Sequence, residues 1–265
     1  MDMSEFICGE NELPLDRLVT DGGLCSIFRT IACVGDSLSS GEFEATDENG
    51  ENKTYHDCFE YSWGQYLARM AGCKVYNFSR GGMTANEYCE MFAEENGCWD
   101  REKACQAYIL ALGANDIHCH PLGSVEDIDL ECFSNNEGTF AGYYAQIVQR
   151  YKQISPDAKF FFMTMPRGDR HTGDGELADA HASLLYELAG IFENAYVLDF
   201  RKYAPEYDEQ FRSRFYLGGH LNPAGYLLTA RMTASYIDYL IRKNPDDFSQ
   251  VGFIGTPYKY SGEKI

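Results

Sequence analysis

The sequence predicts an α/β fold, a three-layer α/β/α sandwich around a five-stranded, mainly parallel sheet. Short apolar runs alternate along the chain with longer segments that carry apolar residues at helical spacing, which is typical of a parallel sheet. Polar motifs follow directly after three of the runs, where open α/β sheets bind their ligands. With 265 residues, 45% of them hydrophobic, the chain is large enough for one such domain with a substantial core.

Five short runs rich in β-branched, aromatic and other apolar residues are the expected strands of this sheet. They span residues 30–34, 74–78, 107–112, 159–165 and 195–200.

The segments between the strands are expected to be helices, because their apolar residues recur every three or four positions. They span residues 61–70, 84–93, 139–154 and 175–192. A last long helix is expected to begin near Asn222-Pro223, since proline is favoured at an early helical position, and to end at Asn244-Pro245.

Two segments interrupt the alternation. Residues 1–28 have an acidic start and a Gly22-Gly23 turn, and we expect them to pack as a cap on a single domain formed by residues 29–265. Residues 42–61 are polar, contain the turn sequence Asp47-Glu48-Asn49-Gly50, and are expected to form one wall of a substrate cleft.

The charge of the chain excludes several classes of partner. The 22 Lys and Arg residues against 41 Asp and Glu give a net charge of -19, which disfavours nucleic acid and anionic membranes. No apolar run approaches the 18 residues of a membrane helix, so no membrane insertion is expected. The first thirty residues lack a secretory pattern and the ten cysteines are scattered, so the sequence predicts a soluble cytoplasmic protein with reduced thiols.

Metal ions and cofactors are not expected. His118-Cys119-His120 is the cluster most similar to a metal site, but it lacks a second pair of ligands at zinc-site spacing. The chemistry is therefore assigned to protein side chains alone.

Four motifs carry residues suited to acyl transfer. They are Gly35-Asp36-Ser37-Leu38, the segment 77–84 with Gly82, Gly113-Ala114-Asn115-Asp116, and His220-Leu221-Asn222-Pro223. Ser37, Gly82 and Asn115 each lie just beyond the carboxyl end of an expected strand, so they should meet at one edge of the sheet.

A serine attacks a carbonyl only when a base takes its proton and hydrogen-bond donors receive the oxyanion. Each residue also has a purely structural interpretation: Ser37 as a helix cap, Gly82 with Gly81 as a strand-to-helix loop, Asn115 as a local turn. The other histidines, His56, His118, His120, His171 and His181, lack the setting of His220 before an expected helix, although His118 could line the cleft.

In this order the four motifs resemble the SGNH, or GDSL, hydrolase family, and the resemblance runs from about residue 29 to about residue 243. It implies a flavodoxin-like SGNH fold, with Ser37 as nucleophile and His220 as base. It also implies the Gly82 backbone and the Asn115 side chain as oxyanion donors. Ser79 stands where that family often has another glycine, and Gly81 competes with Gly82 for its role.

The chain departs from the family pattern before His220, where the expected acid is replaced by Leu217. One expectation is that a backbone carbonyl near Leu217 orients the imidazole and leaves a Ser37-His220 dyad. Another is an acid brought in from elsewhere, and otherwise the protein is weak or inactive as a catalyst. The candidate acids are Asp199, Glu206, Asp208 and Glu209.

The sequence thus predicts a metal-independent serine esterase that forms an acyl-enzyme on Ser37. The resemblance suggests carbohydrate O-acetyl esters first, and lysophospholipid or thioester acyl groups second. Trp63 and the tyrosines are expected to offer aromatic surfaces for sugar rings. The rival prediction is a non-catalytic binding module that keeps the cleft without turnover.

Overall fold

The computed structural model describes residues 3, 5–168 and 175–262, and its centre is a five-stranded parallel sheet. The strands match the five expected runs to within two residues at each end, which confirms the α/β fold class. They are β1 (Thr30–Gly35), β4 (Lys74–Ser79), β5 (Ala107–Ala111), β6 (Lys159–Met163) and β7 (Ala195–Leu198).

The strand order β4-β1-β5-β6-β7 creates one reversal of direction in the sheet. From β1 the chain crosses to β4 on one side, and all later strands are added on the other side. Cys33 of β1 therefore pairs with Asn77 of β4 and with Ile109 of β5. A doubly wound sheet opens a crevice at such a reversal, here between the carboxyl ends of β1 and β5.

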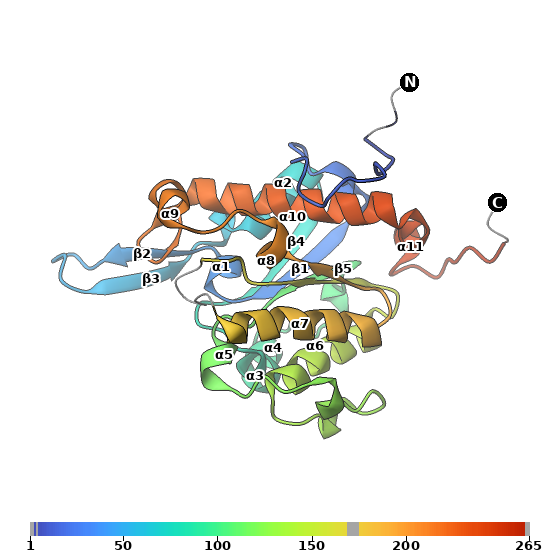
Figure 1. Cartoon of the computed structure of the whole chain (residues 1–265). Helices are drawn as coiled ribbons and strands as arrows, with labels where there is room; N and C mark the ends of the chain where they lie inside the picture. The colour runs from blue at the N-terminus through green and yellow to red at the C-terminus, as the bar shows by residue number, and fades with distance from the viewer. Residues whose placement is uncertain (1–2, 4, 169–174, 263–265) are drawn as a thin grey trace.

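Helices cover both faces of the sheet (Figure 1). The helices α2 (Trp63–Ala71) and α10 (Pro223–Lys243) lie on one face, and α6 (Phe140–Ile154) and α7 (Glu176–Ile191) lie on the other. Alternate residues of β1 feed the two core layers: Ile31 and Cys33 pack toward α2 and α10, while Ala32 and Val34 pack on the opposite face.

Short helices complete the layers. The segment 84–93, expected as one continuous helix, instead contains a π-helical turn, Tyr88–Phe92, between the short helices α3 (Ala85–Glu87) and α4 (Ala93–Glu95). The short α-helices are α1 (Ser37–Ser40), α3 (Ala85–Glu87), α4 (Ala93–Glu95), α5 (Asp116–Cys119), α8 (Phe200–Tyr203), α9 (Glu209–Phe215) and α11 (Pro245–Phe248).

Two antiparallel hairpins lie outside the central sheet. In the polar segment 42–61, β2 (Glu42–Thr46) pairs with β3 (Lys53–Asp57), and this hairpin projects from the body of the domain (Figure 1). The second, much shorter hairpin pairs β8 (Tyr216–Leu217) with β9 (His220–Leu221).

The N-terminal segment lies against α10. Arg17 forms an ion pair with Asp238 at 3.4 Å, and the Val19 N–H donates to Ser235 Oγ at 2.9 Å. Further along α10, Arg242 forms an ion pair with Glu12 at 2.6 Å. Within the described ranges, no helix is both long and apolar enough to cross a membrane.

Candidate active site

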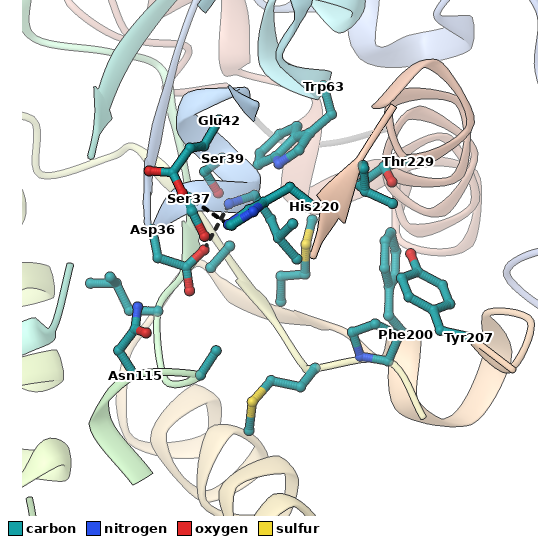
Figure 2. Close-up of a pocket in the computed structure, with 18 of the residues that line it drawn as sticks. Asp36, Ser37, Ser39, Glu42, Trp63, Asn115, Phe200, Tyr207, His220 and Thr229 are labelled. Atoms are coloured by element: carbon teal, nitrogen blue, oxygen red, sulfur yellow. Dashed lines mark hydrogen bonds and ion pairs between the residues drawn. The ribbon is translucent and has the colours of Figure 1, made fainter. Parts of the chain in front are cut away.

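A cavity of about 270 Å³ lies at the carboxyl edge of the sheet, beside the reversal between β1 and β5. Its lining includes all four residues that the sequence motifs single out: Ser37, Gly82, Asn115 and His220. Figure 2 shows Ser37, Glu42 and His220 pointing toward one another, with Phe200 and Tyr207 across the cavity from Ser37 and Asn115.

Ser37 is the first residue of α1, immediately after the turn that ends β1. The Asp36 side chain is the helix cap and accepts a hydrogen bond from the Leu38 N–H at 3.1 Å. The helix-capping role, which was the structural alternative for Ser37, is therefore filled by Asp36. The half-buried Ser37 side chain faces the cavity instead.

Gly82 and Asn115 lie on two loops that are tied together. Asn115 Nδ2 donates to the Met83 carbonyl at 3.0 Å, and the Ala85 N–H donates to Asp116 Oδ1 at 2.8 Å. An amide group has two N–H bonds, so Asn115 retains a second one for a ligand. Gly82 has a φ of +73°, in the left-handed region that favours glycine, and only open space lies where a Cβ would be.

The loop that carries Asn115 rests on buried ionisable groups. Burial raises the pKa of the Asp116 carboxyl to about 6. Beneath the loop, burial lowers the pKa of His181 to about 4. The Nε2–H of this histidine donates to the Leu112 carbonyl at 3.2 Å, so His181 has a structural place below the cavity.

His220 comes from the short hairpin β8–β9 and is 5% exposed. Its ring lies between two glutamates of β2. Nε2 lies 3.0 Å from Glu42 Oε1, and Nδ1 lies 3.3 Å from Glu44 Oε1. Carboxylates therefore face both nitrogens of the imidazole.

This arrangement corrects the expectation about the missing acid. The carboxylate at Nδ1 is that of Glu44, which is not one of the four acids named from the sequence. Two of those acids are engaged elsewhere: Asp199 accepts hydrogen bonds from Thr164 and Tyr186, and Asp208 caps α9. Among the described residues that line the cavity, none of the four acids is present.

Sequence reasoning missed Glu42 and Glu44, although it placed their segment at the cleft. The signal was available in two places. Two acids occur at alternate positions directly after the serine motif, and a Gly218-Gly219 pair precedes His220 where the usual acid is absent. Alternate positions on a strand face the same side, so both acids could reach one ring.

The remainder of the cavity is mostly apolar. Met163, Met165, Phe200 and Tyr207 contribute to its lining. Trp63 also lines it but is only 1% exposed, so the expectation that its face stacks on a sugar is wrong.

Tyr55 is the aromatic residue exposed beside the base. It is 54% exposed, lines the cavity, and packs edge-on against His220 with ring centroids 6.0 Å apart.

The described residues include neither a candidate metal site nor a disulfide. Within the described part of the chain, no group of three His, Cys, Asp or Glu residues is placed to hold a metal ion. His171 lies outside the described residues. All ten cysteines are free thiols, five of them buried.

Comparisons with known proteins agree with the fold. A family model described as the GDSL-like lipase/acylhydrolase family matches residues 33–228. No curated protein matches the chain.

Three solved structures are similar. A family two carbohydrate esterase from Clostridium thermocellum, in complex with cellohexaose, superposes with a TM-score of 0.55 and 17% identity, covering 83% of this chain and 65% of that one. A Lactobacillus plantarum protein superposes with a TM-score of 0.56 and 17% identity, covering 80% of this chain and 97% of that one. The psychrotrophic esterase EstA from Pseudoalteromonas superposes with a TM-score of 0.51 and 15% identity, covering 80% of this chain and 98% of that one. At these identities the likeness shows the fold alone.

Proposed function

The chain belongs to the GDSL-like lipase/acylhydrolase family, and we propose that it is a serine esterase whose nucleophile is Ser37 and whose base is His220. The observation that carries this proposal is the meeting of Ser37, Gly82, Asn115 and His220 at one cavity. Family membership supports esterase or acylhydrolase activity, and the proposal adds the residue roles and a mechanism that needs no metal ion.

In the proposed reaction, Ser37 Oγ attacks the ester carbonyl carbon while His220 Nε2 takes the hydroxyl proton. The Gly82 N–H and the second N–H of Asn115 stabilise the negative charge that develops on the carbonyl oxygen. The intermediate collapses as Nε2 returns the proton to the leaving alcohol. Water then attacks the acyl-enzyme by the same sequence of proton transfers and releases the acid.

O-acyl groups on carbohydrates are the preferred substrates in this proposal. The cavity is at the small end of ligand pockets, so it suits one short acyl group while the rest of a larger substrate stays outside. The exposed ring of Tyr55 beside His220 offers a surface for a sugar. A carbohydrate esterase of similar fold has been solved with cellohexaose.

Esters of longer acyl chains are the second candidate, and the apolar lining of the cavity favours them. Phe200 and Tyr207 lie across the cavity from Ser37, where an acyl chain attached to Ser37 would extend. Lysophospholipids and thioesters present such chains. The net charge of -19 is unfavourable for anionic headgroups.

A panel of acetyl, butyryl and octanoyl p-nitrophenyl esters together with acetylated xylo-oligosaccharides tests the proposal. We expect turnover of the acetyl substrates that EDTA leaves unchanged and that Ser37→Ala abolishes. A fluorophosphonate probe should label Ser37 in the wild type and leave Ser37→Ala unlabelled. A folded wild type with neither labelling nor turnover would instead identify a binding module, and a preference for octanoyl esters would select the second candidate.

A further inference from the structure

The β2–β3 hairpin brings two carboxylates to the imidazole of His220. Glu42 and Glu44 occupy alternate positions of β2 and therefore face the same side of the strand. Phe43, between them, faces the opposite side and packs against Tyr61 and Tyr226 with ring centroids 5.8 and 5.6 Å apart. The aromatic contacts of Phe43 hold the strand in place, and the opposite side of the strand faces His220.

Glu44 is held in place by several donors. One carboxylate oxygen accepts hydrogen bonds from the Gly219 N–H and His220 Nδ1, and the other accepts from Lys53 Nζ at 2.8 Å. The Glu44 side chain is 10% exposed. Burial opposes its ionisation, but the hydrogen bonds from Lys53, Gly219 and His220 outweigh burial and lower the pKa of the carboxyl.

The loop before His220 is shaped to admit this carboxylate. Gly218 has a φ of +70°, and a Cβ on it would lie 2.6 Å from a Glu44 carboxylate oxygen. Any larger residue would displace the glutamate as well as strain the backbone. The Gly218-Gly219 pair thus provides space for Glu44 and a backbone donor to it.

The two glutamates are not equivalent, because the two ring nitrogens have different tasks. An imidazole that takes a proton from a serine uses one nitrogen as the acceptor and keeps a proton on the other. Glu42 faces Nε2, the nitrogen assigned to the Ser37 proton, whereas Glu44 faces Nδ1. Ionised carboxylates only accept hydrogen bonds, so both contacts together require a doubly protonated ring.

We propose that Glu44 is the positioning carboxylate of this site and replaces the acid that is absent at Leu217. The inference rests on the proposed function, since it assigns Glu44 to the base of the esterase reaction. Glu44 accepts the Nδ1–H of His220, which directs the lone pair of Nε2 toward Ser37 and stabilises the imidazolium formed during attack.

No proton passes to Glu44 in this scheme. The Ser37 Oγ–H bond breaks, its proton moves to Nε2, and the Oγ–C bond forms as the carbonyl electron pair moves to oxygen. Nδ1 keeps its proton throughout, and the leaving alcohol takes the proton from Nε2. Nε2 faces Glu42 at 3.0 Å, and this contact must open before Nε2 takes the Ser37 proton.

Kinetics of three hairpin variants test the role of Glu44. We expect Glu44→Gln to lower kcat by about 10² to 10⁴ with KM within a few-fold of wild type, because orientation of the base is lost while the cavity is kept. Glu44→Asp should recover part of the rate. Glu51→Gln, an exposed neutralisation in the turn of the same hairpin, is the matched control and should behave as wild type.

The pH profile of kcat distinguishes a positioning role of Glu44 from a purely structural one, because a structural residue would leave the profile unchanged. In Glu44→Gln the acidic limb of kcat should move to lower pH, since a negative charge beside the imidazolium is removed. The other ionisable groups that line the cavity, Asp36, Glu42, Tyr55 and Tyr207, are unchanged in this variant, as is Lys53, which pairs with Glu44. Wild-type kcat and an unmoved limb in folded Glu44→Gln would overturn the inference and leave the esterase proposal standing.

Proton NMR separates this inference from the proposed function. A far-downfield Nδ1–H resonance of His220, assigned by its loss in His220→Ala, should disappear or move upfield in Glu44→Gln and persist in Glu42→Gln. This measurement needs no turnover. Failure of labelling and hydrolysis in the wild type would refute the esterase proposal, whereas a resonance unaffected by Glu44→Gln would refute the role of Glu44.

Discussion

The central sheet and the β2–β3 hairpin reach the same cavity from two kinds of structure. The sheet places Ser37, Gly82 and Asn115 beyond the ends of neighbouring parallel strands, so their spacing follows from strand register. The hairpin instead brings Glu44 to His220 from the middle of an antiparallel strand outside that sheet. In the proposed mechanism the sheet therefore supplies attack and oxyanion binding, whereas the hairpin supplies the partner of the base and, through Tyr55, a surface at the cavity.

The largest effect is expected from Ser37→Ala, and its combination with Glu44→Gln tests whether the sheet and the hairpin act in the same reaction step. Ser37→Ala should reduce turnover to background, a loss of at least about 10⁴, because the acyl-enzyme cannot form. Adding Glu44→Gln to Ser37→Ala should cost nothing more, since the base then has no proton to take. A further loss in the double variant, measured with acetyl esters, would mean that the hairpin contributes independently of the nucleophile.

Asn115→Ala should come next, with kcat lowered by about 10² to 10³ through loss of one oxyanion donor. The acidic limb of its pH profile should stay in place, because Asn115 carries no charge. Glu44→Gln should move that limb, so the pair of profiles distinguishes a sheet residue from a hairpin residue. Equal shifts in both variants would show that the limb does not report the charge of Glu44.

Acid should remove the contribution that His181, buried on α7 beneath the Asn115 loop, makes to the stability of the domain. The pKa of His181 is about 4 in the folded protein and about 6.5 in an unfolded chain, so the unfolded chain binds protons more readily between these values. The contribution of His181 to the free energy of unfolding should therefore fall, by about 1 to 3 kcal/mol, as the pH drops from about 6.5 to 4. The lowered pKa of Glu44 keeps its charge at pH 5.

Denaturant titrations of wild type and His181→Gln across this pH range measure the effect by difference. The subtraction matters because Asp116, with its pKa raised to about 6, acts in the opposite direction and loses its stabilising contribution as the pH rises. Equal pH slopes in the two proteins would show that His181 does not titrate with unfolding.

The smallest effect is expected at the exposed end of the hairpin. Lys53 forms an ion pair with Glu44 at 2.8 Å, but its side chain is 65% exposed, and exposed pairs contribute about 1 kcal/mol or less. Lys53→Met should therefore lower kcat by only a few-fold, and high salt should reduce the wild-type rate toward that of the variant. A loss as large as that of Glu44→Gln would make Lys53 essential for the alignment of Glu44.

The difference between the two regions also explains what the sequence could predict. Ser37, Gly82 and Asn115 follow strands with clear apolar patterns, and parallel strands share one carboxyl edge, so their convergence followed from local signals. The contact of Glu44 with His220 joins positions 176 apart through a hairpin outside the sheet, and no periodicity encodes that distance. The π-helical turn at 88–92 was missed for a similar reason, since its apolar spacing is that of an ordinary helix.

The separation of Glu44 from His220 along the chain has a consequence for refolding. Ser37 and Glu44 lie on one continuous segment, α1 to β2, and take their places as soon as that segment does. His220 reaches Glu44 only when the segment before α10 closes a loop of well over a hundred residues. Contacts between residues so far apart in the chain form slowly. Regained base alignment would therefore report a long-range closure of the chain rather than the formation of the sheet.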